Sequence, residues 1–220
     1  MPPCGSRLLV ALAFFVALTR GTHAELGPVH RLLDGGARRT YPAWSPDGAR
    51  IAYTDYSQRL PAVYVVGADG SNPRMVVGPT TLGGPPVWSP DSAQIAFSWF
   101  NSGHVWETST VNSDGTDPVT LLQVQGGSRI LAWSPDGGRL LYAAQSRDIR
   151  ATVGLYTMNV DGSDPAWLTD DNGIDAAWSP DGRAIAYTDV TGHDELVWSV
   201  RVMPVNGDEP VHMARASGPT

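Results

Sequence analysis

Apolar and polar positions alternate in short runs along the chain, and one arrangement of these runs returns four times. An apolar or aromatic triplet stands at residues 51–53, 95–97, 140–142 and 185–187. A second run, rich in β-branched and aromatic residues, follows each triplet at residues 63–66, 105–111, 155–160 and 197–202. Runs of this length and composition predict β-strands, and no long helical period accompanies them. We therefore expect an all-β chain.

A tight turn with the sequence W-S-P-D-G precedes each triplet. The motif begins at Trp44, Trp133 and Trp178, and in the copy at Trp88 a serine replaces the final glycine. Proline suits the second position of a type I turn, aspartate the third, and glycine the left-handed position of a three-residue hairpin loop. We predict four hairpins whose large side chains, Trp44 included, are buried between neighbouring sheets. Ser92 in the left-handed position should cost about 1 kcal/mol.

The spacing of the turns indicates a repeat architecture. The four tryptophans lie 44, 45 and 45 residues apart, which is a period typical of repeated four-stranded units. Each repeat also holds a second hairpin signal, Asp-Gly at residues 69, 114 and 161 and Asn-Gly at residue 206. Four antiparallel strands repeated at this period form the blade of a β-propeller, which buries its faces by stacking on other blades. We predict that fold.

The number of blades in the assembled ring stays open. Residues 28–33 resemble the fourth-strand segments at residues 118–122, 165–168 and 210–214. The chain therefore has five fourth strands for four hairpin turns, and the N-terminal one is spare. One arrangement is a closed four-bladed ring with the extra strand on an edge. Another is an open arc that pairs with a second chain, as a homodimer, to close a larger ring. A truncated or degenerate gene product is the third.

These residues resemble a known family. The run W-S-P-D-G-x-x-I-A-[YF], followed by a D-G-S-x-P turn, is similar to the repeat of the TolB-like β-propellers, found in bacterial periplasmic proteins and beside the hydrolase domain of some prolyl-oligopeptidase relatives. The resemblance extends from Val29 to the C-terminus. It implies a propeller that binds other proteins in the cell envelope. Because the chain has four repeats where six blades are usual, and no α/β segment before them, we expect a relative of TolB rather than TolB itself.

The first 24 residues are predicted to be a secretory signal peptide. Arg7 precedes an apolar run at residues 8–18, and small residues up to Ala24 offer a cleavage site. The propeller domain then covers residues 25–220, without Cys4, and we expect a periplasmic or secreted protein that is not inserted in the membrane. Loss of Arg7 and Arg20 takes the formal charge from −7 to −9, which argues against a nucleic-acid partner.

The sequence offers no catalytic or metal-binding constellation. A G-x-S-x-G elbow is absent, and the serine of each W-S-P turn is interpreted as a turn residue. The histidines at residues 30, 104, 193 and 212 lack the spacing of zinc ligands. The Asp-Gly turns lack the alternating acidic ligands of a calcium loop. We therefore predict no catalytic residues, no metal and no cofactor.

Binding has more support in the sequence, because the loops joining the second and third strands of each repeat vary and carry aromatic and arginine side chains. Such side chains are typical of interaction hot spots. The candidate ligand-binding residues are Tyr56, Arg59, Trp99, Phe100, His104, Arg147, Arg150 and His193. Trp99 and Phe100 are the strongest candidate anchors, although a loop aromatic can equally pack back against its own blade.

Arg129 and Asp175 stand just before the third and fourth tryptophans and are candidates for the central channel, with an ordinary polar role at a loop–strand junction as the alternative. We predict an exported, non-enzymatic scaffold that binds a protein, peptide or glycan. One rival is a propeller enzyme of lyase or hydrolase type in which Arg129, Asp175 or His104 supplies the chemistry. The other is a propeller fragment that functions only after assembly.

Overall fold

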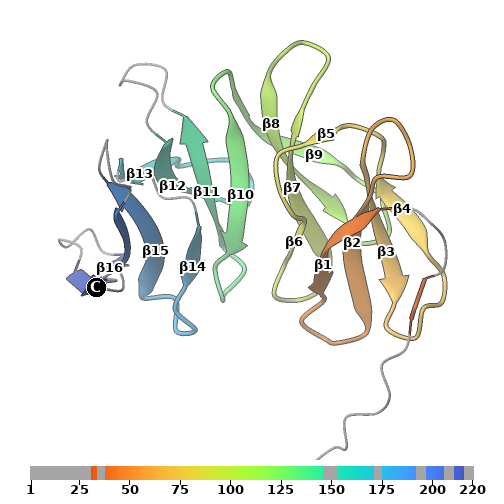
Figure 1. The fold of residues 1–220 in the computed structure, drawn as a ribbon, viewed down its shortest axis with the longest axis horizontal. Helices are drawn as coiled ribbons and strands as arrows, with labels where there is room; N and C mark the ends of the chain where they lie inside the picture. The colour runs from red at the N-terminus through yellow and green to blue at the C-terminus, as the bar shows by residue number, and fades with distance from the viewer. Residues whose placement is uncertain are drawn as a thin grey trace, which may run out of the picture. The chain divides into compact units, whose positions relative to one another are not determined.

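The computed structural model describes residues 31–33, 38–145, 153–170, 175–191, 197–205 and 211–215. These residues form four separate antiparallel sheets, one for each sequence repeat, as Figure 1 shows. The first sheet contains β1 (Arg39–Trp44), β2 (Arg50–Asp55), β3 (Ala62–Gly67) and β4 (Arg74–Val77). The third sheet contains β10 (Ser128–Trp133), β11 (Arg139–Gln145), β12 (Val153–Asn159) and β13 (Ala166–Thr169). The fourth sheet contains β14 (Ala176–Trp178), β15 (Ala184–Thr191), β16 (Val197–Pro204) and β17 (Val211–Arg215).

The second sheet differs because its first strand is interrupted. It contains β5 (Thr81–Leu82), β6 (Val87–Trp88), β7 (Gln94–Phe100), β8 (Trp106–Asn112) and β9 (Val119–Val124). Both β5 and β6 pair with β7, and the sequence Gly-Gly-Pro-Pro at residues 83–86 separates them. Prolines cannot donate to the strand ladder, so pairing stops there and resumes at Val87. The four predicted strands per repeat are otherwise confirmed.

The predicted hairpins are present, and side chains of the motif hold them. In the first turn the Ser45 hydroxyl donates to the Asp47 carboxylate and accepts the backbone N–H of Arg50 at 2.9 Å. The same carboxylate accepts the backbone N–H of Ala49 at 2.9 Å. These hydrogen bonds, the serine hydroxyl foremost, lower the pKa of Asp47 below its ordinary value. The other three turns repeat the arrangement, so the serines act as turn residues.

In the first three repeats the Asp-Gly turns form the second hairpin in the same local way, whereas the Asn-Gly at residue 206 of the fourth repeat lies outside the described residues. The Asp69 carboxylate accepts the backbone N–H of Ser71 at 2.9 Å, and Asp114 and Asp161 accept from Thr116 and Ser163 in the following repeats. The Ser and Thr donors lower the pKa of all three carboxyls. All these aspartates therefore serve hairpin turns, as expected.

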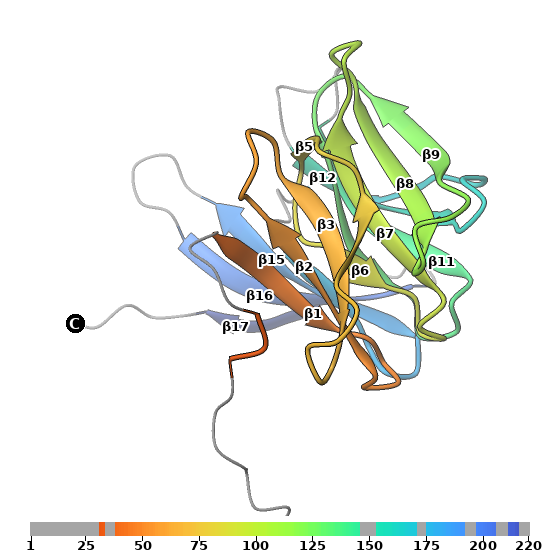
Figure 2. The same cartoon turned by 90° about the vertical axis from the view of Figure 1, so that its right-hand side faces the viewer.

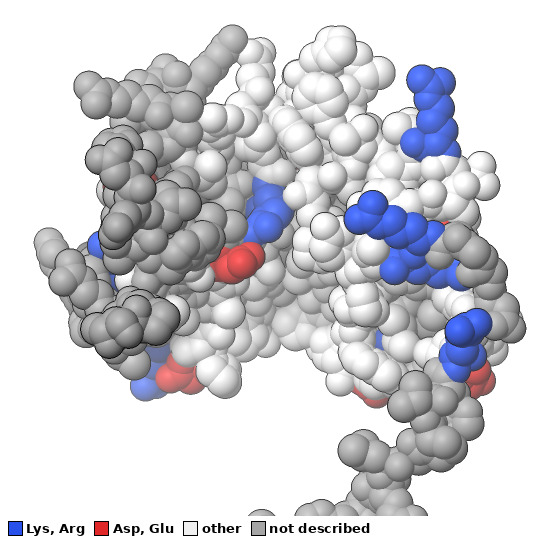
Figure 3. Space-filling model, viewed as in Figure 1, with Lys and Arg blue, Asp and Glu red and all other residues white. Residues whose placement is uncertain are grey.

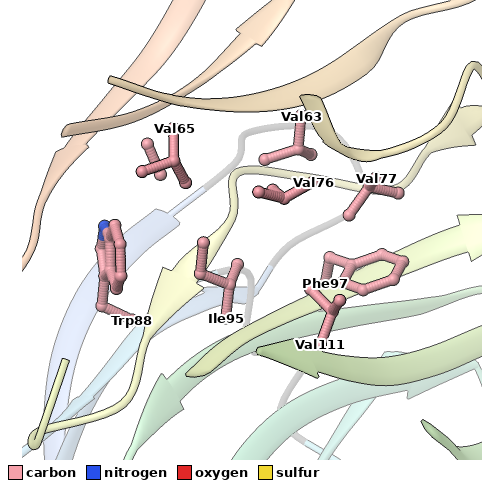
Figure 4. Close-up of a cluster of buried hydrophobic side chains, with 9 residues drawn as sticks. Val63, Val65, Val76, Val77, Trp88, Ile95, Phe97 and Val111 are labelled. Atoms are coloured by element: carbon pink, nitrogen blue, oxygen red, sulfur yellow. The ribbon is translucent and has the colours of Figure 1, made fainter. Parts of the chain in front are cut away.

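Hydrophobic clusters lie between successive sheets. Between the first and second sheets, valines of β3 and β4 pack against Trp88, Ile95 and Phe97, as Figure 4 shows. The Trp88 indole N–H donates to the backbone carbonyl of Ala43 at 3.0 Å, and the Trp133 indole N–H donates to the Val87 carbonyl at 3.2 Å. Each tryptophan thus reaches onto the sheet before its own.

Trp44 is the exception, and its predicted burial is wrong. Its side chain is exposed, whereas Trp88 and Trp133 are buried. The physical reason is that each tryptophan packs on the preceding sheet, and the described residues contain no sheet before the first. The hairpin itself depends on local residues and forms in every repeat, whereas the burial of its tryptophan needs a neighbour.

Candidate functional site

The loops fall on two sides of the sheets, as the repeat predicts. In both views the turn between β1 and β2 lies at the opposite end from the loop between β7 and β8 (Figure 1 and Figure 2). The latter end carries the variable loops. Of the residues predicted to bind a ligand there, Arg147, Arg150 and His193 lie outside the described residues.

Tyr56 and Arg59 belong to the loop between β2 and β3. The Arg38 guanidinium lies over the Tyr56 ring, 5.1 Å from its centroid, in a cation–π contact. Arg59 is exposed. Neither residue lines one of the cavities described below, so this loop contributes a separate surface.

Trp99 packs back against the molecule. Its indole N–H donates to the Ser109 hydroxyl on the neighbouring strand at 3.1 Å, and its ring contacts the cluster between the first and second sheets. It forms one wall of an apolar cavity of about 450 Å³ that also involves Val77 and Val119. This is the alternative in which the loop aromatic packs against its own blade.

Phe100 and His104 belong to an aromatic cluster at the loop end of the second sheet. The Phe100 ring lies 5.4 Å from the Trp106 ring and 5.9 Å from the His104 ring, measured between centroids. The carbonyl oxygen of the Asn101 side chain accepts the backbone N–H groups of Gly103 and Val105 at 2.8 and 3.0 Å. The loop is therefore held in place by its own asparagine, with His104 exposed at its tip.

A second cavity, of about 340 Å³, opens beside this aromatic cluster between the second and third sheets. Trp106, Arg129 and Gln145 line it together with small residues. A Cβ added at Gly83 would lie 2.6 Å from the Trp106 ring, so only glycine lets the indole lie against this backbone. Gln145 and Val153, both in the lining, flank the segment of sequence that carries Arg147 and Arg150.

Arg129, which lines this cavity, forms an ion pair with Asp175, which lies outside the lining. The guanidinium Nη2 of Arg129 lies 2.8 Å from the Asp175 carboxylate, with 30% and 78% of the two side chains exposed. Figure 3 shows basic and acidic atoms side by side over β10 and β14. Solvent screens such a pair, so it contributes little to stability. The pair links the first-strand regions of two successive sheets. Because the Asp175 carboxylate is exposed, another anion can compete with it for the Arg129 guanidinium.

Comparison with known proteins fits this geometry. The sequence matches the family described as TolB beta propeller domain over residues 65–207. The chain belongs to this family. Among solved structures it is similar to TolB from Acinetobacter baumannii, with 20% identity, a TM-score of 0.66, and coverage of 84% of this chain and 46% of that chain.

Solved structures with a similar fold also include enzymes. Oligogalacturonate lyase from Vibrio parahaemolyticus has 14% identity, a TM-score of 0.65, and coverage of 84% of this chain and 55% of that chain. The propeller domain of the trilobed protease from Pyrococcus furiosus has 15% identity, a TM-score of 0.57, and coverage of 81% and 57%. At these identities the likeness concerns the fold alone, and the chain spans about half of each structure.

Sequence reasoning missed several groups that build the site in this TolB beta propeller domain. Trp106 begins a strand, and no turn motif pointed to it. A buried chain of hydroxyls joins Ser98, Thr108 and Ser128 at 3.1 and 2.8 Å, and Ser98 also accepts the backbone N–H of Ile130 at 2.9 Å. This chain fixes the backbone on both sides of Arg129. The alternation of side chains along the strands would have predicted that these residues point inward, but it would not have identified their hydrogen-bond partners.

Glu107 is a buried carboxylate that sequence reasoning also missed. It accepts hydrogen bonds from the side chains of Asn101, Thr120 and Gln123, the latter two at 3.2 and 2.9 Å. It thereby ties the loop that carries His104 to the body of the second sheet.

Among the described residues, no three His, Cys, Asp or Glu side chains are grouped to hold a metal. That part of the chain also contains no helix long and apolar enough to cross a membrane.

Proposed function

We propose that this TolB beta propeller domain is an exported, non-enzymatic scaffold that binds a protein, peptide or glycan partner at the cavity between its second and third sheets. The observation that carries the proposal is the lining of that cavity, where the Trp106 ring and the Arg129 guanidinium border one space of about 340 Å³. An aromatic ring and an arginine around a concave space are typical of recognition sites.

The chemistry of the lining favours a partner with a carboxylate next to a ring. Arg129 can donate to a carboxylate, and the Trp106 face can stack on an aromatic side chain or a sugar ring. In the unliganded protein the exposed Asp175 neutralises the guanidinium. An acidic peptide or an acidic glycan would therefore displace Asp175 rather than bury an unpaired charge.

An envelope or extracellular location agrees with the predicted signal peptide at residues 1–24 and with the similarity to TolB from Acinetobacter baumannii. The acidic charge of the chain, −7 over its whole length, disfavours nucleic acid and anionic membrane surfaces as partners. Binding to a protein or glycan of the envelope remains the function most consistent with both features.

Calorimetric titration with two probes tests this proposal: a short peptide containing Glu next to Tyr, and an oligogalacturonate. We expect Arg129→Ala to weaken binding of the preferred probe at least tenfold. Asp175→Ala should strengthen it, because the guanidinium loses its competing carboxylate. The matched control is Arg183→Ala, which removes an exposed arginine of a hairpin turn outside the cavity lining and should leave affinity unchanged. Equal affinity in the Arg129 variant and the unsubstituted protein would contradict the proposed site.

A lyase-type enzyme is the second candidate, favoured by the Arg129–Asp175 pair and by the fold shared with oligogalacturonate lyase from Vibrio parahaemolyticus. Incubation with oligogalacturonate separates the two candidates. Turnover that persists through purification and disappears in the alanine variants of His104, Arg129 or Asp175 would establish the enzyme. Binding without turnover supports the scaffold.

A further inference from the structure

Contacts between successive sheets follow one rule. In the second and third sheets, the tryptophan of the hairpin lies on the preceding sheet and donates its indole N–H to the carbonyl of the residue before that sheet's own tryptophan. Trp88 and Trp133 are 6% and 8% exposed as a result. Trp178 packs on the third sheet in the same cluster position, although its indole nitrogen has no acceptor among the described residues.

The first sheet has the hairpin tryptophan of this contact, Trp44, but among the described residues no preceding sheet receives it. Trp44 is 60% exposed, and Tyr41, three residues before it, is 49% exposed. The residue that matches Tyr41 in the third repeat is Ile130, which is buried against the second sheet. Tyr41 and Trp44 of β1 are therefore both exposed, whereas their counterparts in the third repeat, Ile130 and Trp133, are buried.

The fourth sheet has the face that, in the other sheets, the following sheet and its tryptophan cover, but among the described residues no sheet follows it. Its Val200 is 48% exposed, whereas the three residues at the same ladder position in the other sheets are 0% exposed. These are Val63, Thr108 and Leu155. Ala186 is likewise exposed, although its three counterparts, Ala52, Ala96 and Leu141, are fully buried. A cavity of about 250 Å³, lined by Ala177, Ala186 and Val200, lies on this face.

The hairpin turns show the same mismatch. A Cβ added at Gly137 would lie 3.8 Å from Pro90 of the preceding turn, and one added at Gly182 would lie 3.7 Å from Pro135. The matching position in the first turn is Gly48, and nothing lies within 4 Å of it. The turn that would fill this space carries Pro180.

We propose that the first-sheet face, Tyr41 and Trp44, docks on the fourth-sheet face, Ala177, Ala186 and Val200, of a second copy of this chain. The Trp44 indole N–H would donate to the Ala177 carbonyl, and Pro180 of that copy would lie against Gly48. The two faces are different surfaces of one chain, so the contact is heterologous. The described residues of each copy form four sheets, so two copies would close a ring of about eight such sheets, within the usual range for propellers.

The occupant is a second copy because both halves of a contact already built twice within the chain are present and unused on one molecule. Closure of the chain on itself would use the same residues, but in the structure Trp44 and Val200 are both exposed. Exposed apolar faces of this kind mark association sites. This inference is independent of what the cavity at Arg129 binds.

The spare fourth strand sets a condition on this assembly. A Cβ added at Gly70 would lie 2.9 Å from the Leu32 carbonyl, just as one at Gly162 would lie 2.7 Å from the Leu121 carbonyl of the preceding sheet's fourth strand. Leu32 thus occupies the position of a preceding fourth strand. In the assembly, either the segment at Leu32 or strand β17 of the second copy takes that position, and the other is displaced.

Light scattering on the purified protein over a concentration series tests the proposal. We expect a discrete dimer for the unsubstituted protein and monomers for both Trp44→Arg and Ala186→Arg, which block opposite halves of the contact. An equimolar mixture of the two variants should form dimers again, because one intact contact remains between them. Trp167→Arg is the matched control, since Trp167 is 61% exposed on β13, outside both faces, and it should stay dimeric.

The affinity for the second copy should fall about 30-fold or more in the Trp44 variant, as for a central tryptophan in an interface. Circular dichroism would check that each variant is folded. A monomeric unsubstituted protein at every concentration would overturn the proposal in favour of self-closure or another occupant. Folded monomeric variants that fail to associate when mixed would overturn the head-to-tail geometry.

Discussion

Ser92 shows how a single side chain can offset its own backbone strain. Its φ is 62°, in the left-handed region that the other three turns fill with glycine. Its hydroxyl accepts the backbone N–H of Asp47 from the preceding turn at 3.1 Å, and its carbonyl accepts from the Arg50 guanidinium at 2.7 Å. The strain was predictable from the sequence, but the hydrogen bonds were not, because their donors come from the preceding repeat.

We expect Ser92→Gly to change the free energy of unfolding by less than about 0.5 kcal/mol. Relief of about 1 kcal/mol of strain and loss of one hydrogen bond of similar size nearly cancel. Gly48→Ser, at φ 70°, should instead destabilise by about 1 kcal/mol, since nothing lies within 4 Å of a Cβ added there and the new hydroxyl therefore has no preceding turn to bond. Urea unfolding of both variants measures this. A full 1 kcal/mol of stabilisation in Ser92→Gly would mean that the hydroxyl contributes nothing.

Whole sheets are held to one another by the hairpin tryptophans. Trp133 is buried in the cluster that also contains Leu140 and Tyr142, and burial raises the pKa of the Tyr142 phenol to about 12, with the neighbouring Tyr156 adding to the shift. The two tyrosine rings stack at 5.4 Å between centroids. Leu140 and Met158 of the same cluster are fully buried, so the close-packed interior leaves little room to relax after a truncation.

Trp133→Ala should accordingly lower the free energy of unfolding by about 3–5 kcal/mol, through lost burial and a remaining cavity. Trp167→Ala removes an exposed indole and should cost less than about 1 kcal/mol. Chemical denaturation followed by circular dichroism compares the two variants, and each of them retains seven of the eight tryptophans. Equal losses would show that the hairpin tryptophans do not hold the sheets together.

The predictability of each element follows from the range of the interactions that form it. The hairpins at Trp44 and Trp178 were predicted because serine, aspartate and glycine within five residues determine them. The placement of Trp106 was not, because it depends on a contact between Gly83 and a residue more than twenty positions away. The interrupted first strand of the second sheet was also missed, although its cause, the prolines at residues 85 and 86, is local. For Arg129 and Asp175 the sequence predicted only a shared location at the central channel and not their ion pair. The burial predicted for Trp44 required a preceding sheet, which the repeat pattern led us to assume.

The molecule as a whole behaves as a row of sheets in which each one is stabilised by its neighbours. The second sheet contacts both the first and the third, whereas the described strands of the fourth sheet contact the third through β10 and β14. In such repeat arrays stability is roughly the sum of each repeat's own stability and that of its interfaces. The fourth sheet should therefore open more readily than the second.

Native-state hydrogen exchange would reveal this difference and its dependence on a second copy. In dilute protein, amides of β16 should exchange faster than those of β8. Raising the protein concentration should slow exchange in β16 and in β1, because association stabilises the covered sheets by mass action, and should leave β8 nearly unchanged. Trp44→Arg should abolish the concentration dependence without altering β8. Exchange in β16 that is as slow as in β8 at every concentration would mean that the fourth sheet already has a permanent neighbour, and hence that a single chain completes its own ring.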